Sequence, residues 1–565
     1  KGDDLEIIFN SKFGKGNTIY QGANRYSIQN FYLYQNKLEI KSNNFSVRAY
    51  MTGESAGDSY DTRFAAINVN RSWKSDTKWF TEYAGAYIQN FLGTIQAGGA
   101  PNPAKSHEAA RAYAQKGALV PGTPAFYDAF QKVISDPNVG TGAKFVDDTR
   151  IYHVDANYNF NQIIDFADIQ VGGSWREYSL NSSGTIFTDY DGPINYNEYG
   201  AYTQVQKKFV DDRFKFTGSI RYDKAKNFDG HFSPRISLTY SAGAKKNHNF
   251  RASYQTGFRN PTTQDLYIGL DAGRAILVGS APDNMDRYTT EPLNVSKTGQ
   301  AIGFPATVTL SGRAAYENSF SYSSILAKNP QKSDFKYVQP ERVQTYELGY
   351  RAIFKGISVD LSGYYNQYTD FIGNKTVVVP YYGKADLSDI TPLPPQLGGP
   401  TPTALIALFN SDYKPFQVYT NSKADISSYG VGVSLTKEIF RDYELGVNYV
   451  WSKFNFDQAS DPDYEAGFNT PEHKFKASFG SPHVYKDLGF NINYRWNSEY
   501  LWESSFMDGI IPANSVFDAQ INYSIRKLKS IIKIGAVNIG GHEYYSAPGT
   551  GHIGSQYYAT WTVKI

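Results

Sequence analysis

The chain has 565 residues with a formal net charge of +2, and it contains no cysteine. The balanced charge argues against nucleic acid as a partner. The lack of cysteine excludes both a disulfide framework and a cysteine-based metal site. No window of eighteen consecutive apolar residues is present, so the sequence predicts no transmembrane helix. The 46 tyrosines and 36 phenylalanines are an excess that is typical of β-strands and of aromatic belts at membrane interfaces.

Alternation of apolar and polar residues predicts about twenty β-strands, and it is clearest over residues 488–496 and 517–525. Because successive side chains of a strand point to opposite faces, each such segment has one apolar face and one polar face. A mean hydropathy of −0.48 is compatible with a membrane barrel, since half of each strand faces a polar lumen. The expected strands span residues 4–11, 28–41, 45–54, 63–75, 79–93, 148–159, 167–178, 197–210, 213–224, 232–242, 249–258, 342–354, 357–369, 428–440, 443–454, 472–480, 487–497, 514–526, 530–539 and 555–565.

The connections between these strands fall into two classes. Short polar turns are expected at residues 42–44, 211–212, 355–356 and 441–442. Very long connections are expected at residues 94–147, 259–341 and 370–427. Loops of this length are uncommon and usually functional. Short turns on one rim and long loops on the other are typical of an outer-membrane β-barrel, with the turns periplasmic and the loops outside.

The first long connection is expected to carry two short helices. An Ala-rich segment over 104–116 lies between Pro103 and Gly117, and Thr123 and Pro124 have the character of a helix N-cap and first-turn proline. We expect the apolar stripe of this second helix to pack against the base of its own loop, and a docking surface for a partner is the alternative. The stripe consists of Phe126, Phe130, Val133 and Ile134.

Two short motifs resemble catalytic signatures without their context. Residues 53–57 match G-x-S-x-G, but that motif needs a helix directly after the serine, and we expect another strand there. His107 and Glu108 begin H-E-x-x-H, but Arg111 occupies the position of the second histidine. We therefore expect no enzyme activity, no catalytic residue and no cofactor.

Two groups of loop residues are candidate binding residues. A carboxylate cluster in the second long connection is a hypothetical calcium site, although its spacing is not that of an EF-hand and loops are rich in aspartate. This cluster consists of Asp271, Asp283 and Asp286. Aromatic residues in predicted loops are candidates for stacking against a sugar or a haem-like ring of a ligand. These aromatic candidates are Trp502, Phe506, Tyr544, Tyr545, Tyr381 and Tyr382.

Several strand-end motifs resemble the barrel of TonB-dependent outer-membrane transporters. The motif at residues 233–235 lies at the start of one expected strand, and the motif at residues 257–261 lies at the end of the next. The residues that carry this resemblance are Ser233, Pro234, Arg235, Gly257, Phe258, Arg259 and Pro261. Segments 198–202 and 347–350 are similar to the family as well, so the resemblance covers essentially the whole chain. Residues 48–60 and the helical first loop resemble the versions found in Bacteroidetes-type bacteria.

The resemblance implies an all-β chain that forms a transmembrane antiparallel β-barrel with long extracellular loops, one of which carries short helices. About twenty of the roughly twenty-two strands of such a transporter are expected here. Residues 1–565 are then the barrel portion, and the N-terminal plug domain is expected to be absent from this chain. The start at Lys1 suggests a mature form or a fragment. The implied function is TonB-energised import of a scarce nutrient, such as an iron chelate, cobalamin, a glycan or a peptide.

The resemblance also implies a bacterial outer-membrane location and a set of partners. These are outer-membrane lipid and lipopolysaccharide, the chain's own plug, the TonB complex, and a surface lipoprotein or other envelope subunit. One alternative is a transporter-like barrel that serves as a structural subunit of a larger envelope complex. Another alternative is a soluble surface β-protein, such as a glycan-binding module, which would bury the apolar faces of its strands in a core.

Overall fold

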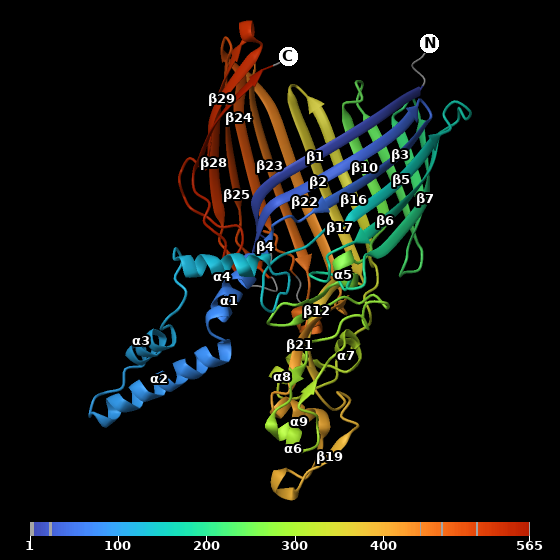
Figure 1. The fold of residues 1–565 in the computed structure, drawn as a ribbon. Coiled ribbons are helices and arrows are strands. Elements are labelled where there is room, and N and C mark those ends of the chain that lie inside the picture. Colours follow the sequence, from blue (N-terminus) through green and yellow to red (C-terminus); the bar gives the residue numbers. More distant parts are fainter. Residues whose placement is uncertain (1–4, 22–24, 441, 465–466, 504–506, 564–565) are drawn as a thin grey trace.

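The computed structural model describes residues 5–21, 25–440, 442–464, 467–503 and 507–563. Its main feature is one long antiparallel sheet curved into a barrel wall, with folded loop segments gathered at one rim (Figure 1). The wall strands are β1 (Leu5–Gln21), β2 (Arg25–Ser42), β3 (Phe45–Ser55), β5 (Arg150–Asn159), β6 (Asp168–Leu180), β7 (Ile194–Phe209), β8 (Phe214–Ala225), β9 (His231–Ala242), β10 (His248–Arg259), β16 (Glu341–Phe354), β17 (Ile357–Thr369), β22 (Ile426–Phe440), β23 (Tyr443–Asn455), β24 (His473–Tyr485), β25 (Leu488–Asn497), β28 (Asn514–Ile525), β29 (Ser530–Val537) and β30 (Gln556–Val563).

Each wall strand pairs antiparallel with the next wall strand along the chain. A two-residue strand, β4 (Tyr60–Asp61), joins the same sheet beside the start of β2. No ladder links β1 to β30 within the ranges given above, where β1 pairs with β2 and β30 with β29. The wall is therefore a continuous series of neighbours from β1 to β30.

The wall shows the alternation that the sequence predicts. In the ladder between β25 and β28, Phe490 faces Ile521 and Tyr494 faces Phe517, and Ile521 is 53% exposed although it is apolar. The other face of the same ladder carries the ion pair of Arg495 with an Asp518 carboxylate. A sheet with exposed apolar residues on one face and charges on the other is the pattern of a barrel between lipid and a polar lumen.

All three very long connections lie at one rim, as expected. Antiparallel pairing places segments 56–149, 260–340 and 370–425 at the end opposite to the short turns 43–44, 210–213 and 355–356 (Figure 1). The turn between β16 and β17 is tight because Lys355 and Gly356 both have positive φ angles, +50° and +73°. Two consecutive positive φ values are what the commonest two-residue hairpin turn requires.

Two of the expected strands are wrong, because the structure has helices there. Segment 63–75 is α1 (Thr62–Trp73) and segment 79–93 is α2 (Asp76–Gln96). The physical reason is helix capping. At the start of α1 the Asp61 carboxylate accepts the backbone N–H groups of Arg63 and Phe64 at 2.8 and 3.0 Å, and at the start of α2 the Ser75 hydroxyl accepts the N–H of Lys78 at 3.4 Å. Eighteen of the twenty expected strands thus remain in the wall of the part described. Residue Ser55 ends β3 well before α1, so residues 53–57 do not form a strand-to-helix turn.

Segment 56–149, called the first-loop unit below, has its own core. It contains α1, α2, α3 (Pro103–Ala114) and α4 (Pro124–Ser135), and the last two confirm the expected short helices. The predicted stripe on α4 packs against α1, with Val133 buried beside Phe64 and Val69. The expectation that this stripe covers its own loop is therefore confirmed. No helix of the described residues is both long and apolar enough to cross a membrane.

Segments 260–340 and 370–425 fold together into a second unit, called the loop cap below. Its five-stranded sheet has the order β11 (Gly269–Asp271), β12 (Ile276–Val278), β21 (Tyr413–Asn421), β18 (Ile372–Pro380) and β15 (Phe320–Ser321). Its core includes Val278, Val377, Phe416 and Val418. Helices are therefore not confined to the first loop, because the cap also holds α5 (Thr263–Tyr267), α6 (Lys297–Ala301), α7 (Gly312–Glu317), α8 (Tyr322–Leu326) and α9 (Thr403–Phe409).

The remaining elements are short. They are the strand pairs β13 (Leu293–Asn294) with β14 (Thr307–Val308), β19 (Ile390–Pro392) with β20 (Pro400–Pro402), and β26 (Tyr500–Trp502) with β27 (Gly509–Ile511), and the 3-10 turns η1 (Pro395–Leu397), η2 (Gln458–Ser460) and η3 (Arg526–Leu528).

An arginine introduced on the outer face of the wall should affect stability far more than one introduced on the lumen face. We expect Ile521→Arg to destabilise the folded protein by about 2–4 kcal/mol, because the outer face contacts hydrocarbon. The matched change Asn522→Arg, one residue along on the lumen face, should change stability far less. Urea titration of folding into lipid vesicles measures both. Equal losses for the two variants would contradict the assignment of the faces.

Candidate functional site

A partly enclosed cavity of about 410 Å³ lies at the long-loop rim, between the first-loop unit and the loop cap. This size lies within the range of small-molecule binding pockets. Aromatic and aliphatic side chains dominate its lining, with a few polar groups among them. The lining residues are Tyr20, Tyr26, Asp61, Phe64, Val139, Ala143, Lys144, Phe145, Asp147, Thr185, Ile186, Phe187, Gln264, Ile268, Leu270 and Leu277.

The first-loop unit supplies one wall of this cavity through the segment that leads into β5. The backbone N–H of Asp61 donates to the carbonyl of Ala143 at 3.0 Å, and the N–H of Phe145 donates to the carbonyl of Ser59 at 2.9 Å. The ring of Phe145 lies 5.5 Å from the ring of Tyr26 at the start of β2. The start of α1 and the rim of the barrel are thereby held together beside the cavity.

The cap supplies the opposite wall through α5 and the strands β11 and β12. Helix α5 begins with a capping box, in which the Thr262 hydroxyl accepts the N–H of Asp265 at 3.1 Å and an Asp265 carboxylate oxygen accepts the N–H of Thr262 at 2.7 Å. This box fixes the start of the helix directly after Pro261. Residues Gln264 and Ile268 then line the cavity.

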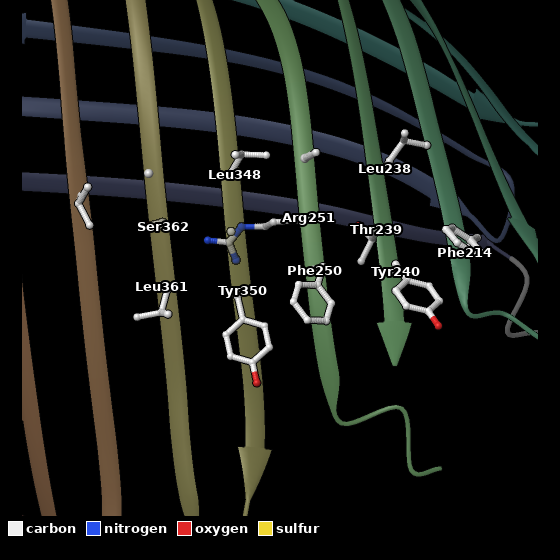
Figure 2. Close-up of a pocket in the computed structure, with 14 residues that line it drawn as sticks. Phe214, Leu238, Thr239, Tyr240, Phe250, Arg251, Leu348, Tyr350, Leu361 and Ser362 are labelled. Carbon is white, nitrogen blue, oxygen red and sulfur yellow. The ribbon is translucent and has the colours of Figure 1, made fainter. Parts of the chain in front are cut away.

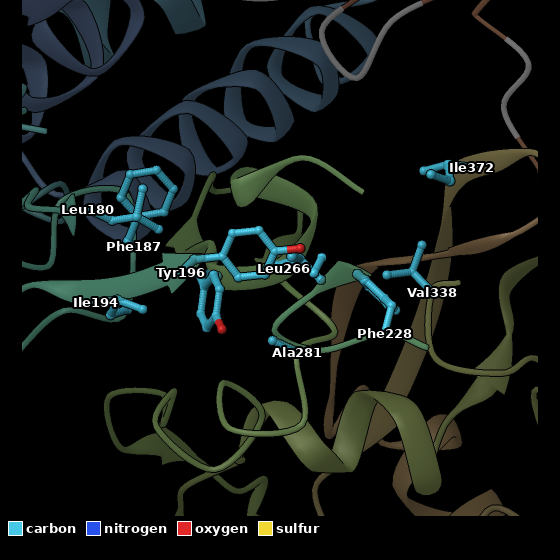
Figure 3. Close-up of a cluster of buried hydrophobic side chains, with 11 residues drawn as sticks. Leu180, Phe187, Ile194, Tyr196, Phe228, Leu266, Ala281, Val338 and Ile372 are labelled. Atoms are coloured by element: carbon cyan, nitrogen blue, oxygen red, sulfur yellow. The ribbon is translucent and has the colours of Figure 1, made fainter. Parts of the chain in front are cut away.

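The connection between β6 and β7 bridges the two walls. The Thr185 hydroxyl donates to the carbonyl of Val146 at 3.0 Å on the side of the first-loop unit. On the side of the cap, the carbonyl of Ile186 accepts the N–H of Gly269 at 2.9 Å. Beneath this connection lies a buried cluster that joins strand ends of the barrel to the cap (Figure 3). The labelled members of this cluster are Leu180, Phe187, Ile194, Tyr196, Phe228, Leu266, Ala281, Val338 and Ile372.

Two carboxyl groups face this largely apolar cavity. Burial raises the pKa of Asp61 above its usual value, although its two backbone N–H donors partly oppose the rise. Burial likewise raises the pKa of Asp147, against the opposing hydrogen bonds from Thr149. The described residues hold no group of three or more acidic or histidine side chains that could bind a metal ion. The arrangement suits an organic ligand with a large apolar part and few polar groups.

Charged side chains line the inside of the wall below the cavity. Arg48 on β3 pairs with Asp155 on β5, with 2.9 Å between Nε and Oδ2. Across the next strands, Arg176 lies 3.8 Å from Glu198, and Arg221 pairs with Asp223 at 2.5 Å. These strands therefore present charged side chains to the lumen, whereas the lining of the cavity above them is largely apolar.

Ion pairs help to tie the cap to the rim. Arg259 at the end of β10 binds Glu341 at 2.6 Å, and the same Glu341 oxygen accepts the backbone N–H of Ile372 at 3.1 Å. Lys375 on β18 and Asp461 in the connection between β23 and β24 form a buried pair at 2.5 Å, with side chains only 6% and 5% exposed.

Sequence reasoning missed this buried pair, because it treated 370–427 as a loop. The available signal was the run of residues 376–379, Thr-Val-Val-Val, which is typical of a buried strand. The structure has β18 there, and Asp461 reaches it from a different loop. Asp461 also accepts the Ser422 hydroxyl at 2.9 Å and the N–H of Lys423 at 3.0 Å.

The structure brings most of the family-motif residues together. Ser233 and Pro234 on β9 and Gly257 and Phe258 on β10 line one shared pocket of about 470 Å³ at the rim. Arg259 anchors the cap as described, and Pro261 precedes α5. Arg235 does not line this pocket. The ladder between β9 and β10 places it opposite Gln255, further from the rim.

The aromatic candidates Trp502, Tyr544 and Tyr545 lie on two neighbouring loops, away from the cavity, whereas Tyr381 and Tyr382 lie in the loop cap, where Tyr382 is buried in an apolar cluster. Trp502 is on β26, and the Tyr545 hydroxyl donates to the carbonyl of Ile510 on β27 at 3.3 Å. The backbone of Tyr544 pairs with Ile553 in the same loop as Tyr545. Phe506 lies outside the described residues.

The three candidate calcium ligands do not converge. Asp271 pairs with Lys414 at 3.1 Å, Asp283 with Lys226 at 3.4 Å, and Asp286 with Arg313 at 2.6 Å. Each carboxylate therefore has a basic partner of its own, and together they form no cation site.

Comparison with known proteins decides the family. The model described as "TonB dependent receptor-like, beta-barrel" matches residues 2–539. The chain belongs to the TonB-dependent receptor family. A search of curated proteins finds no match. The family is one of outer-membrane transport proteins and not a class of enzymes, and its members work with TonB and carry an N-terminal plug.

Solved structures with the same fold come from other bacteria. A mutant of the ferric enterobactin receptor PfeA of Pseudomonas aeruginosa is 11% identical, with a TM-score of 0.56 over 99% of this chain and 67% of that chain. The siderophore receptor PirA of Acinetobacter baumannii is 11% identical, with a TM-score of 0.55 over 99% and 68%. The FrpB iron transporter of Neisseria meningitidis is 10% identical, with a TM-score of 0.56 over 99% and 69%. At these identities the likeness is one of fold.

Membership of the family sets the sidedness of this TonB-dependent receptor barrel in the bacterial outer membrane. Short turns are periplasmic and long loops extracellular in such barrels. The first-loop unit, the loop cap and the cavity between them are therefore on the outer surface of the cell. The finer resemblance to Bacteroidetes-type versions stays a prediction.

The buried pair predicts a specific weakness of the cap. We expect Lys375→Met to destabilise the cap by about 3–5 kcal/mol, because it leaves the Asp461 carboxylate buried without its cation. Protease added to intact cells should then cut segment 370–425 faster. The double change of Lys375→Met with Asp461→Leu should recover much of the resistance, since it removes both charges.

A matched control lies nearby on the same unit. The Lys423 ammonium group pairs with Asp334, but these side chains are 51% and 91% exposed. An exposed pair contributes at most about 1 kcal/mol, so Lys423→Met should leave the rate of cleavage unchanged. A Lys375→Met protein that resists protease as well as the wild type would show that the pair does not hold the cap.

Proposed function

We propose that this chain is the barrel portion of a transporter that imports a scarce nutrient across the outer membrane with energy from TonB. The observation that carries the proposal is the apolar cavity of about 410 Å³ at the extracellular rim, above a polar lumen. A ligand that enters from outside meets this cavity before it reaches the inside of the barrel. Because the chain belongs to a family of transport proteins, we propose that it carries its ligand across the membrane without changing it chemically.

We infer that residues 1–565 supply the wall and loops, and that the plug comes from outside this segment of chain. The charged residues inside the wall, such as Arg48 and Asp155, support a lumen that a polar domain fills. The barrels of outer-membrane transporters, which have about 22 strands, hold a plug in their lumen. In this mechanism, ligand binding at the rim signals through the plug, and TonB pulls on the plug to open a path.

The lining of the cavity supports a ligand with aromatic or branched apolar parts. Iron chelates, cobalamin and peptides include such molecules, and one receptor of the same fold has been solved in complex with enterobactin. We propose that partly exposed loop aromatics make the first contacts with the ligand. These aromatics are Trp502, Tyr544 and Tyr545.

Filling the cavity should block uptake. Leu277 lines the cavity and is partly exposed to it, so Leu277→Trp occupies the ligand space without disturbing a packed core. We expect uptake by the full-length protein to fall at least about tenfold, which corresponds to ~1.4 kcal/mol. The measurement uses labelled iron chelates, cobalamin, glycans and peptides in cells with and without TonB.

The control is Leu326→Trp on α8, where the side chain is 66% exposed on the outside of the cap. This variant should transport like the wild type. Uptake that persists in cells without TonB, or that survives Leu277→Trp unchanged, would falsify the transport proposal.

A second candidate function is that of a subunit in a larger envelope complex, and one observation favours it. Helices α2 and α3 form a hairpin that projects away from the barrel (Figure 1). None of the 21 residues of α2 is buried, and Phe80, Ile88 and Leu92 are 64%, 55% and 48% exposed. From residue 83 to residue 104 the hairpin carries no charged side chain. An exposed apolar helix of this kind is typical of a surface that contacts another protein.

The hairpin is tested independently of transport. We expect the double change of Ile88→Glu with Leu92→Glu to lower co-purification of envelope proteins at least about tenfold, because charges enter the apolar contact. Gln89→Glu, which is exposed on the same helix, is the matched control and should retain the partners. Unchanged co-purification with the double variant would remove the subunit role, and lost co-purification with normal uptake would separate it from transport.

A further inference from the structure

The outer wall carries a shallow apolar groove of about 550 Å³ across β8, β9, β10, β16, β17 and β22 (Figure 2). Strand register places its floor residues in one row, in which large and small side chains alternate. The row consists of Leu238, Ala252, Leu348, Gly363 and Val431. Leu348 is 69% exposed and stands between the hollows at Ala252 and Gly363.

A second row, nearer to the periplasmic turns, is aromatic. The ring of Phe214 lies 4.6 Å from that of Tyr240, and the ring of Phe250 lies 4.9 Å from that of Tyr350. Figure 2 shows Tyr240, Phe250 and Tyr350 side by side, with Leu238 and Leu348 in the next row. Aromatic belts of barrels lie at the boundary between acyl chains and headgroups. The groove therefore opens toward the headgroups of the periplasmic leaflet.

Basic residues stand where those headgroups would lie. The turn after β9 is bonded to the end of β16: the N–H of Ile353 donates to the carbonyl of Asn247 at 3.2 Å, and the Asn247 amide donates to the carbonyl of Ile353 at 3.1 Å. The turns after β9 and β16 carry Lys245 and Lys355, both exposed. Across the described residues, neither ammonium group has a hydrogen bond or an ion pair.

The other charged groups of this edge are already engaged or lie beyond Lys245 and Lys355. Lys246 binds the backbone carbonyl of Asp211, and Arg213 binds the carbonyls of Ser241 and Gly243 at 3.2 and 2.9 Å. Acidic groups lie on both sides of this part of the edge: Asp211 and Asp212 are in the turn after β7, beyond Lys246, and Glu438 and Asp442 are at the turn after β22, beyond Lys355. The turns 210–213, 243–247 and 355–356 together hold four basic side chains and two acidic ones.

We propose that this groove binds one anionic phospholipid of the periplasmic leaflet, with its phosphate between Lys245 and Lys355. The two acyl chains lie in the hollows at Ala252 and Gly363, on either side of Leu348. The apolar groove alone would accept any lipid chain. The two free ammonium groups next to it add the charge complementarity that selects an anionic headgroup, as basic residues do at membrane surfaces.

The location gives this lipid a structural role in the receptor. Strands β10, β16, β17 and β22 are the ones from whose extracellular ends both segments of the loop cap emerge. Strands in a sheet move with their neighbours, so a lipid that fills hollows between these strands braces the part of the wall that carries the cap. The groove is thus a lipid site coupled to the extracellular unit through four strands.

The test is native mass spectrometry of the full-length protein with phosphatidylglycerol or phosphatidylcholine added. We expect one phosphatidylglycerol to bind at least about tenfold more tightly than phosphatidylcholine. Gly363→Leu should abolish this site, because a side chain there fills the hollow. A Cβ atom at this glycine meets only the carbonyl oxygen of Gly430, at 3.8 Å, so the fold tolerates the change.

Two further variants complete the test. Ala201→Leu on β7 places a leucine side chain at an exposed position outside the groove and should bind lipid like the wild type. The double change of Lys245→Gln with Lys355→Gln should keep a bound lipid but remove the preference for phosphatidylglycerol. Equal binding of the two lipids by the wild type, or equal behaviour of Gly363→Leu and Ala201→Leu, would overturn the proposal. Heat-dependent gel mobility confirms that each variant is folded.

Discussion

Pairing of backbone hydrogen-bond groups is the constraint on which the rest of this structure depends. In hydrocarbon, an unpaired N–H or carbonyl group costs several kcal/mol, so a membrane wall of strands must be a continuous ladder. From β1 to β30 each strand pairs with its neighbours, but no ladder of the described residues joins β30 back to β1. In such a wall each side chain points either outward to lipid or inward to the lumen. Ile521 and Asp518, three residues apart on β28, take opposite choices.

The connections at the extracellular rim are free of this constraint, and there the chain builds compact units instead. The first-loop unit and the loop cap each bury an apolar core, around Val133 and around Phe416 respectively. Few but specific polar contacts set how these units sit on the barrel. A buried pair such as Lys375 with Asp461 adds little net stability over an apolar pair, but breaking it is costly, so it favours one arrangement of the loops. The cavity between the units depends on that arrangement.

The sequence predicted the wall well and the rim poorly, for identifiable reasons. Period-2 alternation reported the faces of β25 and β28 because lipid and lumen impose opposite demands on successive residues. The same reasoning failed over 63–75 and 79–93, where the Asp61 cap and i, i+4 apolar spacing make helices. Strands β18 and β21 were missed because they pair inside the cap, where both faces are buried and no alternation results.

The sequence by itself determined the barrel, its sidedness and its family, because these follow from local alternation, turn length and motifs at strand ends. Only the tertiary structure decided which residues form the cavity and the lipid groove. The reason is that both sites join residues far apart in the chain. Tyr26 and Leu277 meet at the cavity through loop packing, and Ala252 and Gly363 share a row through strand register. No local pattern encodes either juxtaposition, since each one depends on how separate segments are brought together by the folded wall.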